Sequence, residues 1–426
     1  MSKLYVSIEK NGVLTAVGTI EGSGPSDARF RYDRKYLKSG DAVPVSISLP
    51  LRERPFSAAV TAAFFEGLLP EGFTRRTVAQ WMHVDEADYL PILHGLGREC
   101  LGALCITEDG DSMDAAYEPI DNERVHELAA EGASRSAELV TNAHLSLTGA
   151  SGKAGLYLEP NTGQWYLPLG LAPSTHIVKQ SHIRFDNIVL NEQLAQMTAA
   201  KCGIRVPKSF IINTGKGGED DVLLATERYD RVMDPAAGKI DGLPKPYRLH
   251  QEDFAQVMGI PAYMKYEQSD DGFLTRMFDV LREYSSDPIK DELRLWDTIV
   301  FDYLVGNTDA HLKNFSLLYS PDLKSMRLSP AYDIVSTAVY EQSTRELAIR
   351  IGGASTIDEV RREDFARAAA DAGLGEKMAM RRFDSVRSKF RRAIHEAAEE
   401  LTEAGFVNAS SMEERILKNG GIARCE

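Results

Sequence analysis

The spacing of the apolar residues changes along this chain, and that change restricts the fold more than any other feature. Residues 5–8 and 13–17 are strand-like segments on either side of Asn11-Gly12, a pair that favours the positive φ angles of a tight hairpin. Alternating and short apolar segments of this kind predict strands. Further segments predicted as strands lie at 43–49, 156–158, 165–167, 176–179, 210–212 and 223–225.

Beyond Gln251 the apolar residues recur at helical spacing instead. Leu293, Trp296, Val300 and Leu304 share one face of a predicted helix that begins at Asp287-Pro288. Earlier helices are predicted from about residue 57 to 68 and from 187 to 201, and residues 358–417 are also predicted to be helical. A sheet-rich first part followed by a helical last part predicts an α+β fold.

Composition indicates a globular chain with more than one packed unit. The 426 residues are 43% apolar and 26% charged, and so long a chain is expected to form two or three units. Residues 107–135 are acidic and poor in large apolar side chains, which is typical of a linker at a domain boundary.

Charge and cysteine content exclude several protein classes. The 49 basic residues and 63 acidic residues give a net charge of −14, which disfavours independent binding to nucleic acid or to anionic membranes. The four cysteines match neither a metal knuckle nor a disulfide framework. The first residues do not resemble a signal peptide and no apolar run could span a bilayer, so we expect a cytoplasmic protein.

The segment 306–316 carries the most chemical information, because it places several polar side chains directly after the long apolar helix. Asp309 precedes Asn314 by the spacing found in phosphotransferase catalytic loops. In those loops the aspartate accepts the hydroxyl proton and the asparagine binds Mg²⁺. Asp333, flanked by apolar residues, is a natural second Mg²⁺ ligand. His311 is expected to orient Asp309 or a phosphate.

Upstream residues could bind the phosphates of a nucleotide. Residues 146–155 form a loop of small residues whose N–H groups could surround phosphate oxygens, although it is not a Walker A loop. Lys179 ends a predicted strand where its ammonium could reach phosphates, and Glu192 on the following helix could hold it in place. Residues 227–229 leave a strand where backbone groups could contact a purine.

Each of these features also has a purely structural interpretation. Asp309 could be a helix-capping or loop-closing carboxylate, and Asn314 a turn residue. Lys179 and Glu192 could form a surface ion pair that contributes little, and a small-residue loop is usually only a turn. The combination of Asp309, Asn314 and Asp333 favours chemistry over these alternatives.

Several motifs in the same order resemble the HipA family of serine/threonine kinase toxins from type II HipBA toxin–antitoxin systems. The resemblance covers nearly the whole chain. It rests on the segments 68–71, 97–103, 146–150, 175–179, 191–192, 227–231, 248–253, 308–316 and 332–334.

The resemblance implies three parts: a β-rich N-terminal subdomain at 1–106, a mixed α/β ATP-binding lobe with its linker at 107–250, and an all-α C-terminal kinase lobe at 251–426. It implies ATP and Mg²⁺ as cofactors, Asp309 as the catalytic base, Asn314 and Asp333 as metal ligands, and Glu192 as the ion-pair partner of Lys179. Ser146 matches the serine that such kinases autophosphorylate. The implied nucleotide-binding residues are Leu147, Thr148, Gly149, Ala150, Ser151, Gly152, Lys179, Glu227, Arg228, Tyr229, His311, Lys313, Asn314, Tyr332 and Asp333.

The resemblance also implies partners. Family members phosphorylate a translation component such as glutamyl-tRNA synthetase. They are neutralised by HipB, a helix-turn-helix antitoxin, and reach operator DNA only through it. Two departures concern the loop and the strand that follows, because Ser151 replaces a common glutamine and Leu169 a frequent lysine. Two other functions remain open: an antitoxin-bound co-repressor with little catalysis, and a small-molecule kinase.

One local exception to the acidic composition is the segment 377–392, which holds seven basic residues and one acid, Asp384. The favoured interpretation is a solvated helix face balanced by the glutamates that follow, at 396–403. The alternative is a contact with DNA or a partner within a repressor complex.

Overall fold

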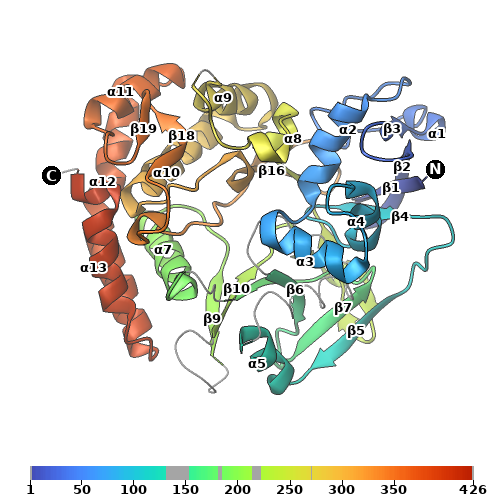
Figure 1. Cartoon of the computed structure of the whole chain (residues 1–426), viewed down its shortest axis with the longest axis horizontal. Helices are drawn as coiled ribbons and strands as arrows, with labels where there is room; N and C mark the ends of the chain where they lie inside the picture. The colour runs from blue at the N-terminus through green and yellow to red at the C-terminus, as the bar shows by residue number, and fades with distance from the viewer. Residues whose placement is uncertain (1, 131–152, 181–184, 214–221, 270, 425–426) are drawn as a thin grey trace. The chain divides into compact units, whose positions relative to one another are not determined.

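The computed structural model describes residues 2–130, 153–180, 185–213, 222–269 and 271–424, and Figure 1 shows their helices and strands. The chain divides into two compact units by its internal contacts. Unit 1 comprises Met1–His182, Ile212–Ala262 and Leu318–Lys324, and unit 2 comprises Ile183–Ile211, Tyr263–Leu317 and Ser325–Glu426. This division differs from the expected boundaries at 106 and 250, because unit 1 includes both of the first two predicted parts.

The N-terminal sheet contains the predicted hairpin. Strands β1 (Ser2–Lys10) and β2 (Val13–Gly22) pair antiparallel, and both Asn11 and Gly12 have positive φ angles. Strands β3 (Arg29–Tyr32) and β4 (Leu104–Thr107) complete a sheet in the order β3-β2-β1-β4. The helices that accompany this sheet in unit 1 are α1 (Arg34–Leu37), α2 (Ala58–Phe65), α3 (Gly72–Met82) and α4 (Tyr89–Leu96).

The strand predicted at 43–49 is wrong, because this segment is an irregular loop. Val45 and Leu49 are buried as a strand pattern would require, but their backbone groups bond to a side chain instead of a neighbouring strand. The hydroxyl of Tyr32 accepts from the Val45 N–H at 2.9 Å and donates to the Leu49 carbonyl at 2.5 Å. The helix predicted from residue 57 is confirmed, since Ser57 caps α2 by accepting from the Val60 N–H.

A second sheet in the order β5-β7-β6-β8-β10-β9 carries the middle of the chain. Its apolar face is covered by α5 (Asn122–Ala130), whose Val125 and Leu128 pack with Leu156, Val178 and Leu223. The strands are β5 (Ala115–Ile120), β6 (Lys153–Leu158), β7 (Trp165–Gly170), β8 (His176–Gln180), β9 (Ser209–Asn213) and β10 (Val222–Glu227).

The linker expected at 107–135 is corrected by this sheet, because β5 and α5 occupy residues 115–130. Two buried apolar residues suffice to anchor α5, and its acidic residues remain on the outside, so composition alone suggested a linker. Short elements follow in unit 1: β11 (Arg231–Met233), β12 (Lys239–Ile240), β13 (Leu243–Pro244), β14 (Pro246–Arg248), β15 (Gln251–Asp253) and α8 (Phe254–Met258).

Unit 2 is mainly helical, as expected for the last part of the chain. The predicted helix after Asp287 is confirmed as α10, and its Trp296 is fully buried and donates to the Ala379 carbonyl at 2.9 Å. The helices are α7 (Ile188–Cys202), α9 (Phe273–Tyr284), α10 (Pro288–Val305), α11 (Arg362–Asp371), α12 (Glu376–Glu403) and α13 (Ala409–Asn419).

The α+β class is confirmed, but residues 251–426 are not purely helical. Besides β15 they contain β16 (Ser316–Tyr319), β17 (Met326–Leu328), β18 (Glu346–Ile351) and β19 (Ala354–Thr356). These strands are too short for their alternation to stand out from helical spacing. Within the described ranges, no helix is both long and apolar enough to cross a membrane.

Candidate active site

The candidate catalytic loop begins where α10 ends at Gly306. This glycine has φ +83°, and a Cβ at its position would lie 2.9 Å from the Cβ of Ala338. Only glycine therefore allows the chain to leave the helix here without strain. Thr308 then fixes the loop, because its N–H donates to Thr337 Oγ1 at 2.7 Å and its carbonyl accepts from the Ala348 N–H at 3.0 Å.

A buried carboxylate lies beneath the start of the loop. Asp302, in the last turn of α10, accepts from the side-chain amide of Asn307 at 3.0 Å and from the Asn307 N–H through its carbonyl at 2.8 Å. Burial raises the pKa of Asp302 to about 7, and the Asn307 hydrogen bond opposes this rise. The carboxyl group therefore carries a proton for part of the time near neutral pH.

Asp309 and Asn314 are joined within the loop. The side-chain amide of Asn314 donates to the backbone carbonyl of Asp309 at 2.9 Å, and the Asp309 side chain accepts from the hydroxyl of Tyr266 at 2.9 Å. Asp309 is exposed, whereas Asn314 is buried. Because the Asn314 nitrogen is bound within the loop, its side-chain oxygen is the atom available to a ligand.

His311 lies in the same loop as a neutral, buried imidazole. Burial lowers its pKa well below the ordinary value, and the nearby charge of Lys265 lowers it further while Asp333 acts in the opposite direction. Its ring packs edge-on against Tyr266, with 5.2 Å between the centroids, and its buried Nδ1 has no hydrogen-bond partner. A neutral ring with an unused nitrogen is suited to a polar ligand group.

The segment carrying Asp333 is tied to the loop. The hydroxyl of Tyr332 donates to the Lys313 carbonyl at 2.8 Å and lies 2.6 Å from the Ser316 hydroxyl. Asp333 has φ +58°, which is uncommon for a residue other than glycine and occurs often at functional positions. Asp309, His311, Asn314, Tyr332 and Asp333 thus all belong to unit 2, in two segments joined by hydrogen bonds.

The donor set fits Mg²⁺. The side-chain oxygens of Asn314 and Asp333 are hard ligands, and Mg²⁺ in phosphotransferases is held by few protein oxygens together with substrate phosphates. Within the described ranges, no group of three His, Cys, Asp or Glu residues forms a complete protein site for a metal ion. The two residues are therefore suited to a metal that is shared with a nucleotide.

Lys179 occupies β8 in unit 1, with another lysine beside it. Lys179 pairs with Lys153 of β6 across the sheet, and alternation places it on the face opposite the core residue Val178. Two adjacent ammonium groups on one face favour an anionic ligand, because like charges directly opposite each other destabilise a sheet. The sequence analysis did not select Lys153 as a nucleotide-site residue; register alone identifies it.

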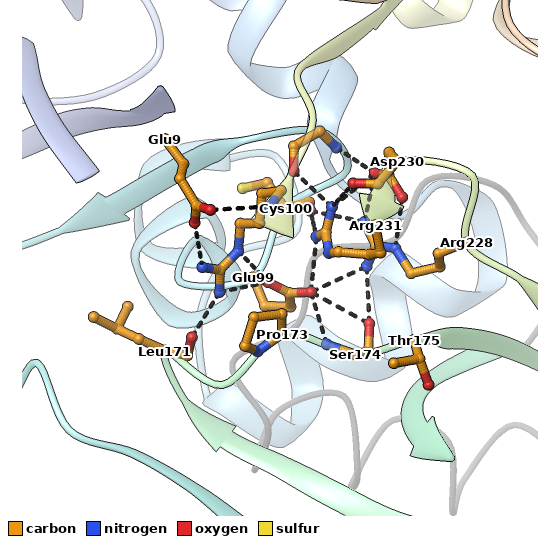
Figure 2. A network of polar contacts seen from close by, with 12 residues as sticks. Glu9, Glu99, Cys100, Leu171, Pro173, Ser174, Thr175, Arg228, Asp230 and Arg231 are labelled. Carbon is orange, nitrogen blue, oxygen red and sulfur yellow. Dashed lines mark hydrogen bonds and ion pairs between the residues drawn. The ribbon is translucent and has the colours of Figure 1, made fainter. Parts of the chain in front are cut away.

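The segment 227–229 follows β10, and its central residue points away from any ligand. The guanidinium of Arg228 is fully buried, and it donates to Asp230 at 2.8 and 2.9 Å and to Glu99 at 3.2 Å (Figure 2). The Arg228 N–H donates to the Thr175 carbonyl at 2.8 Å. Arg228 thus has a structural position, contrary to its predicted contact with the nucleotide. Glu227 is exposed and Tyr229 is half-buried, so both remain candidates.

Other predicted residues are not placed at the site. Ser146 and the loop Leu147, Thr148, Gly149, Ala150, Ser151 and Gly152 lie outside the described residues. Glu192, on α7, is buried and accepts from the Gln196 side chain at 3.3 Å. Because Lys179 belongs to unit 1 and Glu192 to unit 2, their pairing stays a prediction.

Two residues that the sequence did not suggest are Tyr266 and Lys265. Tyr266 contacts both Asp309 and His311, and Lys265 supplies the charge that acts on the histidine and a carbonyl that accepts from the Leu312 N–H. They lie about forty residues before the loop and belong to no motif, so only the tertiary structure brings them to it.

Comparisons with known proteins agree with this arrangement. "Putative kinase Y4mE" of Sinorhizobium fredii is 32% identical over 91% of this chain and 90% of its own length. The "Serine/threonine-protein kinase toxin HipA" of Shewanella oneidensis is 25% identical over 75% of this chain and 72% of its own length.

A solved structure shares the fold. HipA in the complex of Shewanella oneidensis HipA, HipB and operator DNA superposes with a TM-score of 0.79 and 21% identity, covering 99% of this chain and 97% of that one. Family models match in both parts of the sequence: the HipA N-terminal domain at residues 11–107 and the HipA-like C-terminal domain at 145–396. This chain belongs to the HipA family.

Proposed function

We propose that this protein is an ATP-dependent serine/threonine protein kinase that acts as the toxin of a toxin–antitoxin module. The hydrogen bond from the Asn314 amide to the Asp309 carbonyl carries this proposal, because it couples a proton acceptor to a metal ligand within one loop. Kinase-type relatives that cover most of the chain support the same class of reaction.

In this proposal each residue has one task. Asp309 accepts the proton of the attacking hydroxyl, and the Tyr266 hydroxyl positions its carboxylate. Asn314 and Asp333 hold Mg²⁺, which when bound neutralises charge on the phosphates. Lys179 and Lys153 bind phosphate oxygens. Glu227 and Tyr229 border the adenine, and His311, Lys313 and Tyr332 complete the nucleotide site.

The regulation and partners in this proposal follow the family. Ser146 is the autophosphorylation site, and the loop 147–152 covers the triphosphate. The partner is a HipB-like helix-turn-helix antitoxin, through which the protein reaches operator DNA; the solved relative is such a complex. The substrate is a protein of the translation machinery such as glutamyl-tRNA synthetase, and the site of action is the cytoplasm.

The test is phosphate transfer from radiolabelled ATP with Mg²⁺ to the protein itself and to lysate proteins. The Asp309→Asn variant should lose about 10²- to 10⁴-fold in rate, the range for loss of a general base. Asp371→Asn, at an exposed aspartate that ends α11, is the matched control and should label like the unmodified protein.

Three results would count against the proposal. Absence of transfer from the unmodified protein, or equal labelling by Asp309→Asn, would exclude Asp309-based catalysis and favour the co-repressor alternative, which an operator-binding assay with the antitoxin would then examine. Transfer to metabolites but not to proteins would identify a small-molecule kinase. Labelling that persists in Ser146→Ala would move the autophosphorylation site elsewhere.

A further inference from the structure

A cavity of about 340 Å³ lies entirely within unit 2, and neither Asp309 nor Asp333 lines it. Four cations line this cavity from three parts of the chain: Arg205 after α7, Lys290 and Arg294 on α10, and Arg327 on β17. This concentration of positive charge is unexpected in a chain with a net charge of −14.

The acids near the cavity do not balance these cations. Asp297, which also lines it, forms an ion pair with Arg382. The fully buried Asp291 is shared, since it accepts from Arg294 at 2.9 Å and from Arg327 at 2.8 Å. One carboxylate therefore serves two guanidinium groups.

Two of the four cations have no acid beside them. Among the residues that the structure describes, none forms a hydrogen bond or ion pair with the side chain of Arg205 or of Lys290, and both side chains are exposed. Lys290 also lies in the first turn of the eighteen-residue helix α10, where the helix dipole adds positive potential. The charges of Arg205 and Arg327 act to lower the pKa of Arg294, after burial itself, so these groups lie near one another.

The chemistry of this lining selects a phosphate group. Guanidinium groups match phosphate oxygens in a two-pronged geometry, and lysine adds a point charge. A volume of about 340 Å³ is at the small end of ligand pockets, so it suits a phosphate with a small substituent and excludes a nucleic-acid duplex.

The cavity also reaches the catalytic loop. Asn314 and Phe315 line it, and the next residue, Ser316, accepts the Ser329 N–H at 2.9 Å through its carbonyl. The Asn314 N–H is itself bonded to the His311 carbonyl at 2.8 Å. An occupied cavity would therefore restrain the segment that carries the proposed metal ligand.

We propose that this cavity binds a small phosphate-bearing anion through Arg205, Lys290, Arg294 and Arg327, and that binding stabilises residues 311–316. The proposal does not depend on kinase activity, because it rests on the charges and the volume within unit 2.

The test measures binding of inorganic phosphate to the full chain by calorimetry at constant ionic strength, with hydrogen exchange of the 311–316 amides as a second readout. The double variant Arg205→Gln/Lys290→Gln should weaken phosphate binding at least about tenfold, since each lost charge-assisted hydrogen bond has a large effect. It should also abolish the phosphate-dependent protection of 311–316. Neither side chain has a described partner, so the variant should fold normally.

The matched control is Lys377→Gln/Arg381→Gln, which removes the same charge from exposed positions on α12. It should bind phosphate within about twofold of the unmodified protein. Equal loss in both variants, unchanged binding in Arg205→Gln/Lys290→Gln, or no binding by the unmodified protein would each overturn the proposal.

Further probes identify the source of the phosphate. Tighter binding of phosphoserine than of inorganic phosphate would assign the cavity to a phosphorylated side chain, and equal or weaker binding would assign it to a free anion. A DNA duplex that binds through Arg205 and Lys290 where phosphate does not would overturn the proposal in favour of a nucleic-acid surface.

Discussion

Replacing Glu99 by glutamine should strongly destabilise unit 1. Glu99 accepts from three arginines: Arg228 at 3.2 Å, Arg231 at 2.8 Å and Arg248 at 2.8 Å (Figure 2). Its side chain is only 1% exposed. Although burial alone would raise the pKa of Glu99, the three arginines hold it at about 2. This carboxylate is therefore the centre of a buried ionic network.

The magnitude follows from the charges that remain. Glu9 and Asp230 pair with the same arginines, so the intact network holds three carboxylates and three guanidinium groups. Glu99→Gln leaves one buried positive charge without compensation, which costs about 3–5 kcal/mol. That is a large part of the stability of about 5–15 kcal/mol typical of a folded domain.

The assay is urea unfolding followed by circular dichroism. The control is Glu118→Gln, which removes a carboxylate from an exposed pair with Arg124 and should cost at most about 1 kcal/mol. Adding Arg231→Gln to Glu99→Gln removes one charge of each sign and should recover part of the loss.

The pH dependence gives a second check. A carboxylate whose pKa is lowered on folding contributes its stability above the unfolded value of 4.5, and this contribution is lost as the pH falls toward 2. The difference between the unmodified protein and Glu99→Gln should therefore shrink below pH 4.5. A cost for Glu99→Gln no larger than that of Glu118→Gln would refute the electrostatic account of this network.

Two further predictions concern the end of α10. Asp302→Asn should gain stability relative to the unmodified protein between pH 5 and pH 8, because the buried carboxyl must ionise as the pH rises through its pKa of about 7; the rise from 3.8 sets an upper limit of about 4 kcal/mol, and urea unfolding at both pH values would contradict this if the difference were constant. Gly306→Ala should cost about 2 kcal/mol or more, from its φ of +83° and the contact with Ala338, whereas Gly40→Ala, where a Cβ meets nothing within 4 Å, should be nearly neutral in thermal unfolding; equal effects would show that the φ angle does not matter.

The fold class and several elements could be predicted from local signals. The hairpin at Asn11-Gly12 and the helices that begin after Ser57 and Asp287 were predicted correctly, because turn chemistry, capping and periodicity act over a few residues. The segments at 43–49 and 107–135 were not, because their structure depends on distant partners: the Tyr32 hydroxyl in one case and the sheet beneath α5 in the other.

The basic segment 377–392 shows the same limit. It lies on one helix, α12, and several of its charges are balanced: Arg382 by Asp297, Arg387 by Asp384 and Arg392 by Glu396. The glutamates that follow account for only part of this balance, since Asp297 comes from α10. These pairs favour the interpretation as an ordinary helix face.

The sequence by itself determined the order of elements, the α+β class and the spacing of Asp309, Asn314 and Asp333, because periodicity and motif spacing are properties of the chain alone. Only the tertiary structure decided that Arg228 belongs to a buried ionic network, that Tyr266 contacts Asp309, and that Arg205 shares a cavity with Lys290. These contacts join residues far apart in the sequence, where burial and charge act through space and leave no local pattern.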